Sequence, residues 1–224
     1  MPASRDRILK NLPAIFRILK EEAVRWEEPV VGKFINGPDG PFKVLVSTLL
    51  SLRTKDRTTL EASRRLFALG TTPRAILALA QKRIEKTIYP VGFYRTKAAN
   101  LLKVCAILLD RYDGKVPDDL EALLALPGVG RKTANLVVTL AFGKPGICVD
   151  THVHRITNRW GLVRTSTPDE TEQALRKILP TRYWIIINDL LVSYGQNLCV
   201  PVSPFCSRCR IRRFCSRKGV AKSR

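Results

Sequence analysis

The sequence lacks any apolar run close to the roughly 20 residues needed to cross a bilayer. Its longest apolar stretches are Leu136–Phe142 and Trp184–Ile187, so we expect no membrane span. Met1–Lys20 mixes Lys and Arg with Ile, Leu and Phe, and thus lacks the apolar core of a secretory leader. This stretch predicts an amphipathic helix, with a mitochondrial transit peptide as the alternative. We expect an intracellular protein, in the cytoplasm or nucleoid if the source is prokaryotic.

Acidic residues are scarce, with 19 Asp and Glu against 39 Lys and Arg and a formal net charge of +20. This excess is too large for an ordinary metabolic enzyme and indicates a polyanionic partner. Nucleic acid is the leading candidate and an anionic membrane surface the alternative. Between Ser207 and Arg224, eight residues are Lys or Arg and none is acidic, so we expect the C-terminal segment to form a cationic surface.

Strand-like alternation of apolar and polar residues is absent, as are internal repeats and low-complexity segments. Apolar residues instead recur at helical spacing, as in Leu101, Val104, Cys105, Leu108 and Leu109. The sequence therefore predicts an all-α fold. A chain of 224 residues with 45% hydrophobic content can bury one large core or two small ones.

Local chemistry predicts several element ends. Capping residues predict three helix starts: Thr167 with Pro168 and Glu170, Thr72 with Pro73, and Asp118 or Asp119 ahead of Leu120. Gly195 is expected to end a helix that begins near Thr181. Asn36–Pro41, which is rich in Gly and Pro, predicts a loop and a domain boundary.

Four of the six cysteines lie near the C-terminus with the spacing C-x6-C-x2-C-x5-C: Cys199, Cys206, Cys209 and Cys215. Four thiolates in one short stretch are a ligand set for a [4Fe–4S] cluster, which we predict here. Zinc is an alternative, although its sites usually consist of two short ligand pairs separated by a longer span. Disulfides are the other alternative, typical of secreted proteins. Cys105 and Cys148 lie in apolar stretches and are expected to be buried.

Two closely spaced glycines, Gly128 and Gly130, lie in Leu126–Ala134 between two apolar helical stretches. They permit a tight turn whose backbone can approach another surface. A helix begins directly after them, and its N–H groups and dipole favour an anion such as a DNA phosphate. The alternative is a plain helix–helix turn in which Lys132 is an ordinary solvated lysine.

A second segment, Val149–His152, contains Asp150, which on its own could simply cap a helix. Four matches together resemble the endonuclease III family of DNA repair glycosylases, of the helix-hairpin-helix superfamily: Leu126–Ala134, Val149–His152, Leu49–Ser51 with Asp56, and the four cysteines. The resemblance covers essentially the whole chain. Val91–Tyr94, with Lys97 and Asn100, is similar to the family's DNA-facing loop.

The resemblance implies two helical domains with an active-site cleft between them. One is a six-helix domain of residues 34–144 that carries the helix-hairpin-helix, and the other combines residues 1–33 and 145–224 and carries the cluster. The implied function is that of a bifunctional DNA glycosylase with apurinic/apyrimidinic (AP) lyase activity, which excises oxidised pyrimidines in base excision repair. The implied partner is double-stranded DNA containing damaged bases or abasic sites, bound by a monomer.

The resemblance also implies the roles of individual residues. Lys132 corresponds to the nucleophile and Asp150 to the essential carboxylate. An amine attacks a sugar carbon only when it is neutral, and both a helix N-terminus and the adjacent Arg131 disfavour the ammonium form. Asp150 can accept the lysine's proton or stabilise positive charge on the sugar.

Further residues are expected to contact DNA: Gly128, Gly130, His152, Arg53, Phe93, Arg212 and Arg213. Arg53 and Phe93 occupy the family's two gap-filling positions, where Gln and Leu are common in bacterial members, and Arg212 and Arg213 are expected to contact phosphates. One alternative within repair is an adenine- or thymine-directed mismatch glycosylase. Another, from a different class, is a non-enzymatic DNA-binding or redox-signalling iron–sulfur protein.

Overall fold

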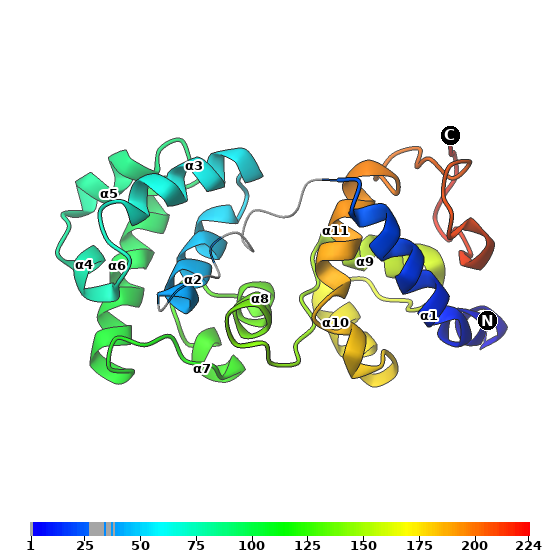
Figure 1. Ribbon diagram of the computed structural model, residues 1–224, viewed down its shortest axis with the longest axis horizontal. Helices are drawn as coiled ribbons and strands as arrows, with labels where there is room; N and C mark the ends of the chain where they lie inside the picture. Colours follow the sequence, from blue (N-terminus) through cyan, green and yellow to red (C-terminus); the bar gives the residue numbers. More distant parts are fainter. Residues whose placement is uncertain (1, 27–33, 35–36, 38) are drawn as a thin grey trace. The chain divides into compact units, whose positions relative to one another are not determined.

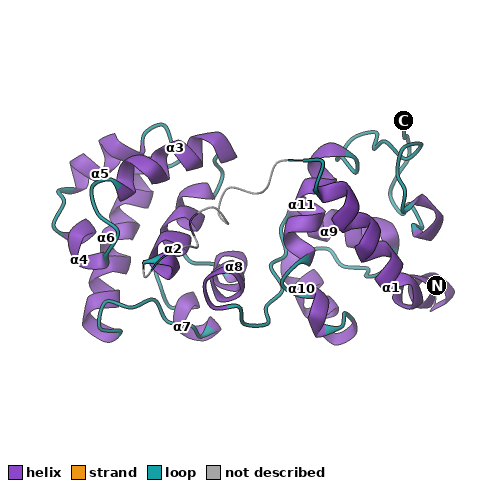
Figure 2. Ribbon diagram, in the orientation of Figure 1, coloured by secondary structure: helices purple, strands orange, loops and turns teal. Residues whose placement is uncertain are grey.

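The computed structural model describes residues 2–26, 34, 37 and 39–224. Over these residues the chain forms eleven α-helices and no strand (Figures 1 and 2), which confirms the all-α prediction. It separates into two compact units, Pro29–Gly146 and Met1–Glu28 with Ile147–Arg224. The predicted boundary at 33/34 adjoins residues 27–33, which the structure does not describe, and the second break follows Gly146. None of the described helices is both long and apolar enough to cross a membrane.

The unit Pro29–Gly146 is built around one buried helix. Its described helices are α2 (Gly40–Ser51), α3 (Asp56–Phe67), α4 (Pro73–Leu77), α5 (Gln81–Ile88), α6 (Tyr94–Arg111), α7 (Leu120–Leu124) and α8 (Arg131–Phe142). α2 packs against α3, α6 and α8. It is buried on nearly every side, as expected for a helix that is apolar over most of its circumference. Pro41, expected in a loop, instead occupies the first turn of α2, where a proline is tolerated.

The second unit combines the two ends of the chain (Figure 1). Its elements are α1 (Pro2–Ala23), α9 (Thr151–Trp160), α10 (Pro168–Ile178), the 3₁₀ turn η2 (Thr181–Tyr183), α11 (Ile187–Asn197) and the 3₁₀ turn η3 (Arg212–Phe214). Ile8, Leu12, Ile15 and Leu19 form one buried face of α1, so the amphipathic prediction is confirmed. Truncating any of these four to Ala should cost about 2–5 kcal/mol of stability.

The three predicted helix starts are present. Oxygen atoms of the capping side chains accept backbone N–H bonds: Thr72 from Ala75 at 3.2 Å, Asp119 from Ala122 at 2.9 Å, and Thr167 from Glu170 at 3.2 Å. Of the two candidate aspartates, the cap is therefore Asp119. Asp118 forms an ion pair with Lys144, with 2.8 Å between the charged atoms.

The prediction for Gly195 is wrong. α11 begins at Ile187 and continues through Gly195 to Asn197, while Thr181 begins only a 3₁₀ turn. A Cβ atom on Gly195 would collide with the imidazole of His152 on α9. The glycine therefore permits close packing of α9 and α11. This packing offsets the roughly 1 kcal/mol that Gly costs a helix relative to Ala.

Candidate functional site

Lys132 lies in the first turn of α8, directly after the glycine turn. The amide of Val129 donates to the carbonyl of Leu126 at 3.1 Å, and Gly128 has a φ of 81°, which a side chain would strain. Gly130 is the N-cap of α8 and has no side chain with which to cap it, so this helix end retains the properties that favour an anion. The side chain of Lys132 is exposed. The local geometry is thus the predicted hairpin.

Asp150 is the N-cap of α9. Its Oδ1 atom accepts hydrogen bonds from the amides of His152 at 2.8 Å and Val153 at 2.9 Å. These bonds anchor the half-buried carboxylate at the positive end of the helix dipole. The cap explains the presence of an acidic residue here, and it also fixes the orientation of the carboxylate.

His152 is half-buried and faces its own unit. Its Nδ1 atom lies 3.0 Å from Nη2 of Arg155, and the same guanidinium donates to the carbonyls of Gly195 at 3.1 Å and Cys199 at 2.9 Å. Arg155 therefore ties the segment that follows Asp150 to the first of the four clustered cysteines. The expected contact between His152 and DNA stays a prediction.

The four C-terminal cysteines line one cavity, together with apolar residues that include Leu198, Phe205 and Ile211. All six cysteines are free thiols, and Cys105 and Cys148 are buried as predicted. Over the described residues, no three His, Cys, Asp or Glu side chains are grouped so that they could share one metal ion. Four thiols that line one cavity would instead suit a multi-iron cluster, which takes four cysteine ligands.

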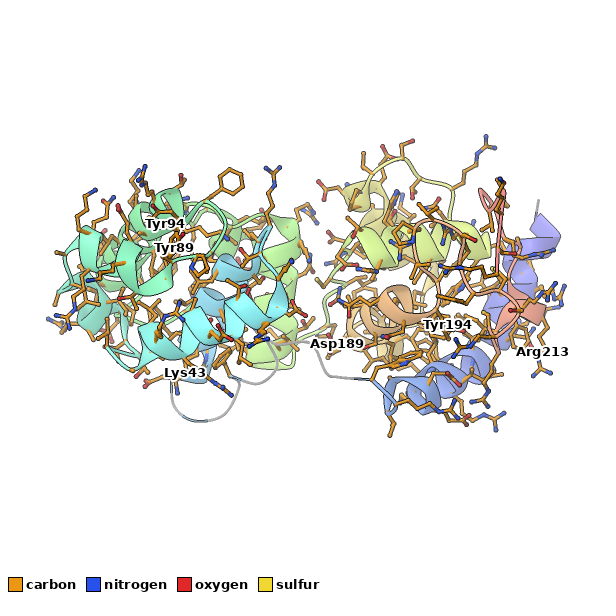
Figure 3. All side chains as sticks on the ribbon, turned by 90° about the horizontal axis from the view of Figure 1, so that it is seen from above. Lys43, Tyr89, Tyr94, Asp189, Tyr194 and Arg213 are labelled. Carbon is orange, nitrogen blue, oxygen red and sulfur yellow. The ribbon has the colours of Figure 1, made fainter. Side chains whose placement is uncertain are left out.

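The surroundings of the sulfur atoms suit a thiolate cluster. The hydroxyl of Tyr194, labelled in Figure 3, lies 3.2 Å from Sγ of Cys209. Nη1 of Arg159 lies 3.4 Å from Sγ of Cys199, and the amide of Arg217 lies 3.4 Å from Sγ of Cys215. Donors directed at sulfur stabilise its anionic form. Burial meanwhile raises the pKa of the Cys215 thiol to about 11, so binding of iron would release protons.

Arg159 is a buried arginine that the sequence analysis did not identify. Its side chain donates to the carbonyls of Val200 at 2.8 Å and Pro201 at 2.5 Å. It thereby holds the loop between the first two cysteines against α9, and Arg155 holds Cys199 from one turn earlier. The available signal was two arginines four residues apart on the helix that follows Asp150.

The arginines of the cluster segment fall into two groups. Arg212 and Arg213 are exposed on η3, and Arg213 lies at the periphery in Figure 3. Arg210 instead pairs with Glu21 at 2.8 Å and Glu22 at 3.1 Å on α1. Its charge is compensated within the protein, so Arg212 and Arg213 are the better candidates for phosphate contacts.

Arg53 and Phe93 come from separate loops of the unit Pro29–Gly146, and the structure brings them together. The guanidinium carbon of Arg53 lies 5.5 Å from the centre of the Phe93 ring. Both side chains are exposed, and Phe93 retains 62% of its accessible surface. A large exposed aromatic side chain beside an arginine is suited to stacking against bases.

Comparison with known proteins identifies the family. Residues 46–181 match the model of the HhH-GPD superfamily of base excision DNA repair proteins. The chain is 46% identical to endonuclease III of Thermotoga maritima over 187 residues, which cover 82% of this chain and 88% of that one. It is 38% identical to endonuclease III of Escherichia coli over 178 residues, covering 80% and 84% of the two chains.

A solved structure gives the same result. The trapped endonuclease III–DNA covalent intermediate with an estranged adenine superimposes with a TM-score of 0.79 at 37% identity, over 91% of this chain and 94% of that one. A chain with this similarity to endonuclease III thus contains the hairpin with Lys132, the Asp150 cap and the four cysteines that line one cavity. The chain belongs to the endonuclease III family of the HhH-GPD superfamily of base excision DNA repair proteins.

Proposed function

We propose that this chain binds duplex DNA at a damaged pyrimidine and uses Lys132 and Asp150 to excise the base and cleave the strand. Its activity is that of a bifunctional DNA glycosylase and AP lyase acting on oxidised pyrimidines, as in the endonuclease III family to which it belongs. The observation that carries the residue assignment is the exposed Lys132 in the first turn of α8, directly after the glycine turn.

In the glycosylase step, the neutral amine of Lys132 attacks C1′ of the damaged nucleotide. A bond forms between Nζ and C1′, and the bond from C1′ to the base breaks with its electron pair on the departing base, which takes up a proton. The ring bond from C1′ to O4′ then opens as the nitrogen donates its electron pair. The pair of the broken bond stays on O4′, which takes up a proton, and an imine remains between Lys132 and the deoxyribose.

In the lyase step, the imine acidifies the proton on C2′. Removal of that proton forms a C1′–C2′ enamine, and this expels the 3′ phosphate by breaking the bond from C3′ to oxygen. Hydrolysis of the imine with water then releases Lys132. One lysine thus serves both steps, which is why this residue separates the lyases from family members that only excise bases.

The proposed role of Asp150 is electrostatic and proton-accepting. Positive charge develops on the sugar as the base departs, and a carboxylate fixed in place by two backbone amides stabilises that charge without reorganising. The same group can take the proton that Lys132 loses when its bond to C1′ forms.

We further propose that Cys199, Cys206, Cys209 and Cys215 hold a [4Fe–4S] cluster. The all-thiol donor set, the shared cavity and the donors directed at three of the sulfur atoms support this group. Such a cluster would cross-link the segment that presents Arg212 and Arg213, which is a structural contribution. None of the steps above uses it.

The net charge of +20 supports binding to the DNA backbone, because each neutralised phosphate releases condensed counterions. Extruding the damaged base costs a few kcal/mol, and pyrimidines that have lost aromaticity stack poorly, so their extrusion costs less. The proposed partner is therefore duplex DNA that contains such a base or an abasic site.

Borohydride trapping tests the assignment of Lys132. Reduction of the imine in the presence of abasic DNA should yield a covalent adduct on a peptide containing Lys132, and Lys132→Ala should abolish both adduct and nicking. Lys103→Met, which changes an exposed lysine on α6, is the matched control. It should form the adduct and nick abasic DNA as the wild-type protein does. An adduct on another lysine would overturn the assignment. Absence of any nicking by the wild-type protein would favour the non-enzymatic alternative.

A further inference from the structure

The two loops that present Arg53 and Phe93 have unusual backbone conformations. Arg53 has a φ of 52° and Phe93 a φ of 57°, the left-handed region that non-glycine residues rarely occupy. Such conformations persist only where the surrounding structure holds them in place. The restraint must come from contacts around these two loops.

One restraint is direct contact between the loops. Gly92, the neighbour of Phe93, donates its amide hydrogen to Oγ1 of Thr54, the neighbour of Arg53, at 3.1 Å. A Cβ atom on Gly92 would lie only 2.6 Å from the carbonyl oxygen of Arg53. The backbones of the two loops are therefore in contact at this point.

The second restraint is Lys97. Its Nζ atom donates to the carbonyls of Leu50 at 2.8 Å and Leu52 at 2.5 Å, and to Oγ1 of Thr54 at 3.2 Å. An ammonium group has three N–H donors, so these bonds use all of them. The backbone amide of Lys97 also donates to the carbonyl of Phe93 at 3.0 Å. That amide bond is the ordinary first bond of α6, whose N-cap is Phe93. The side chain of Lys97 thus ties the segment Leu50–Thr54 to the helix that begins after Phe93.

This use of Lys97 differs from that of a lysine that binds phosphate. The side chain is half-buried, and each of its acceptors is a protein oxygen on the segment Leu50–Thr54. Burial lowers the pKa of Lys97 to about 8, because taking the ammonium out of water disfavours its charged form. A half-buried charge held by neutral acceptors carries a desolvation cost, which the three hydrogen bonds of Lys97 offset.

We propose that Lys97 is a positioning residue for base extrusion, which holds Arg53 and Phe93 together as one unit that enters the duplex. This inference rests on the proposed function. Without the ammonium, the segment Leu50–Thr54 loses three bonds, and Arg53 is held less firmly beside Phe93. In this role Lys97 acts through Arg53 and Phe93 rather than through a contact of its own with DNA.

The test is Lys97→Met, which keeps the length of the side chain and removes its donors. Single-turnover base excision should slow by about 10- to 100-fold, because a misplacement of about 1 Å can cost about 10²-fold in rate. Cleavage of a pre-formed abasic site should change by less than about 3-fold, because no base has to be extruded there. Lys103→Met on the same helix is the matched control and should match the wild-type protein in both assays.

A fluorescence measurement separates positioning from general structural damage. The probe is 2-aminopurine placed opposite a non-cleavable tetrahydrofuran abasic site. The emission of 2-aminopurine changes when side chains enter the gap and alter base stacking. At saturating protein, Lys97→Met should give a smaller change than the wild-type protein or Lys103→Met. An unchanged amplitude, or an equal fall in excision and lyase rates, would overturn the proposal.

If Lys97→Met does not fold, Thr54→Val tests the same connection, because it removes only the hydroxyl shared by Lys97 and Gly92. It should reduce base excision selectively, and equal effects on both reactions would overturn the proposal. Failure of the proposed function would look different, because the wild-type protein would then neither excise bases nor cleave abasic sites.

Discussion

The guanidinium of Arg53 lies over the ring of Phe93, with 5.5 Å between the guanidinium carbon and the ring centre. This is within the range of a cation–π interaction. The contact joins two residues that are 40 positions apart in the chain and belong to two loops with left-handed backbone conformations. Tyr89 and Tyr94, which flank the loop that carries Phe93, are labelled in Figure 3. Their rings pack edge to face, with 5.4 Å between the ring centres. Because the ring of Phe93 supports its guanidinium, Arg53 can present its N–H donors to a base left without its partner.

The first prediction concerns the base opposite the lesion. If Arg53 bonds the orphaned base, the O6 and N7 acceptors of guanine should favour excision opposite guanine over adenine by about 1–3 kcal/mol. Arg53→Gln should shrink that preference and leave abasic-site cleavage nearly unchanged. The measurement is single-turnover excision of one lesion paired with each base. Arg57→Gln, which changes an exposed arginine paired with Glu61, is the control; equal ratios in all three proteins would leave Arg53 as a backbone contact.

The second prediction separates the two roles of Asp150. Asp150→Asn retains an amide oxygen that can accept from His152 and Val153, so the helix cap and the thermal stability should change little. The charge is lost, and the excision rate should fall by about 10²- to 10³-fold, as for other preorganised electrostatic groups. Asp119→Asn makes the same change at the cap of α7 and should leave the rate unaltered. An active Asp150→Asn protein would remove the carboxylate from the mechanism.

The third prediction concerns the cluster and Arg159. Protein purified without oxidation should contain about four irons per chain; one zinc and no iron would contradict the prediction. Arg159→Met leaves the carbonyls of Val200 and Pro201 without their donor, which should destabilise the fold by about 1–3 kcal/mol. In the presence of a chelator, Arg159→Met should also lose its iron–sulfur absorbance in the visible range faster than the wild-type protein. Arg164→Met, an exposed position just beyond α9, should lose iron at the wild-type rate.

The fourth prediction uses salt dependence to compare the arginines of the cluster segment. Removing Arg212 and Arg213 together should weaken binding to damaged and undamaged duplexes alike. It should also reduce the slope of log affinity against log salt by about 1.8, at about 0.9 per phosphate contact. Arg210→Met should change this slope much less, because Arg210 already pairs with Glu21 and Glu22. A loss confined to damaged DNA would show that Arg212 and Arg213 read the lesion.

The fifth prediction concerns pH. Lys97 becomes neutral as the pH rises through about 8 and then has only two N–H donors for three acceptors. The ratio of the excision rates of the wild-type protein and Lys97→Met should therefore fall towards one above pH 8. Other cationic side chains lie on or beside these loops, among them Arg53, Lys55, Arg65 and Arg95. Both proteins contain them, so the ratio isolates Lys97.

Folding stability should respond in the opposite direction. The pKa of Lys97 is lower in the folded chain than the ordinary lysine value of 10.5, so between about pH 8 and 10.5 the unfolded chain binds more protons. Stability rises with pH wherever that holds. A fall in excision caused by Lys97 is therefore accompanied by a small gain in stability, which thermal unfolding can detect. Parallel losses of activity and stability would indicate another cause.

Much of the fold could be predicted from short segments. Thr72, Asp119 and Thr167 cap helices because each side chain reaches an amide only three residues ahead. Periodicity marked the buried face of α6, although Leu109 is only partly buried. The four cysteines and the glycine turn of the hairpin are also recognisable in the sequence, because each pattern lies within a short stretch of the chain.

The tertiary structure decided the features that depend on distant partners. Gly195 has the residue type of a helix end, yet the approach of His152 makes it a packing position inside α11. Lys97 finds its first acceptor 47 residues away, and Arg159 reaches Pro201 across 42 residues. An exposed lysine and a buried one look alike in sequence, because the acceptors that hold a buried charge are chosen by which surfaces pack together.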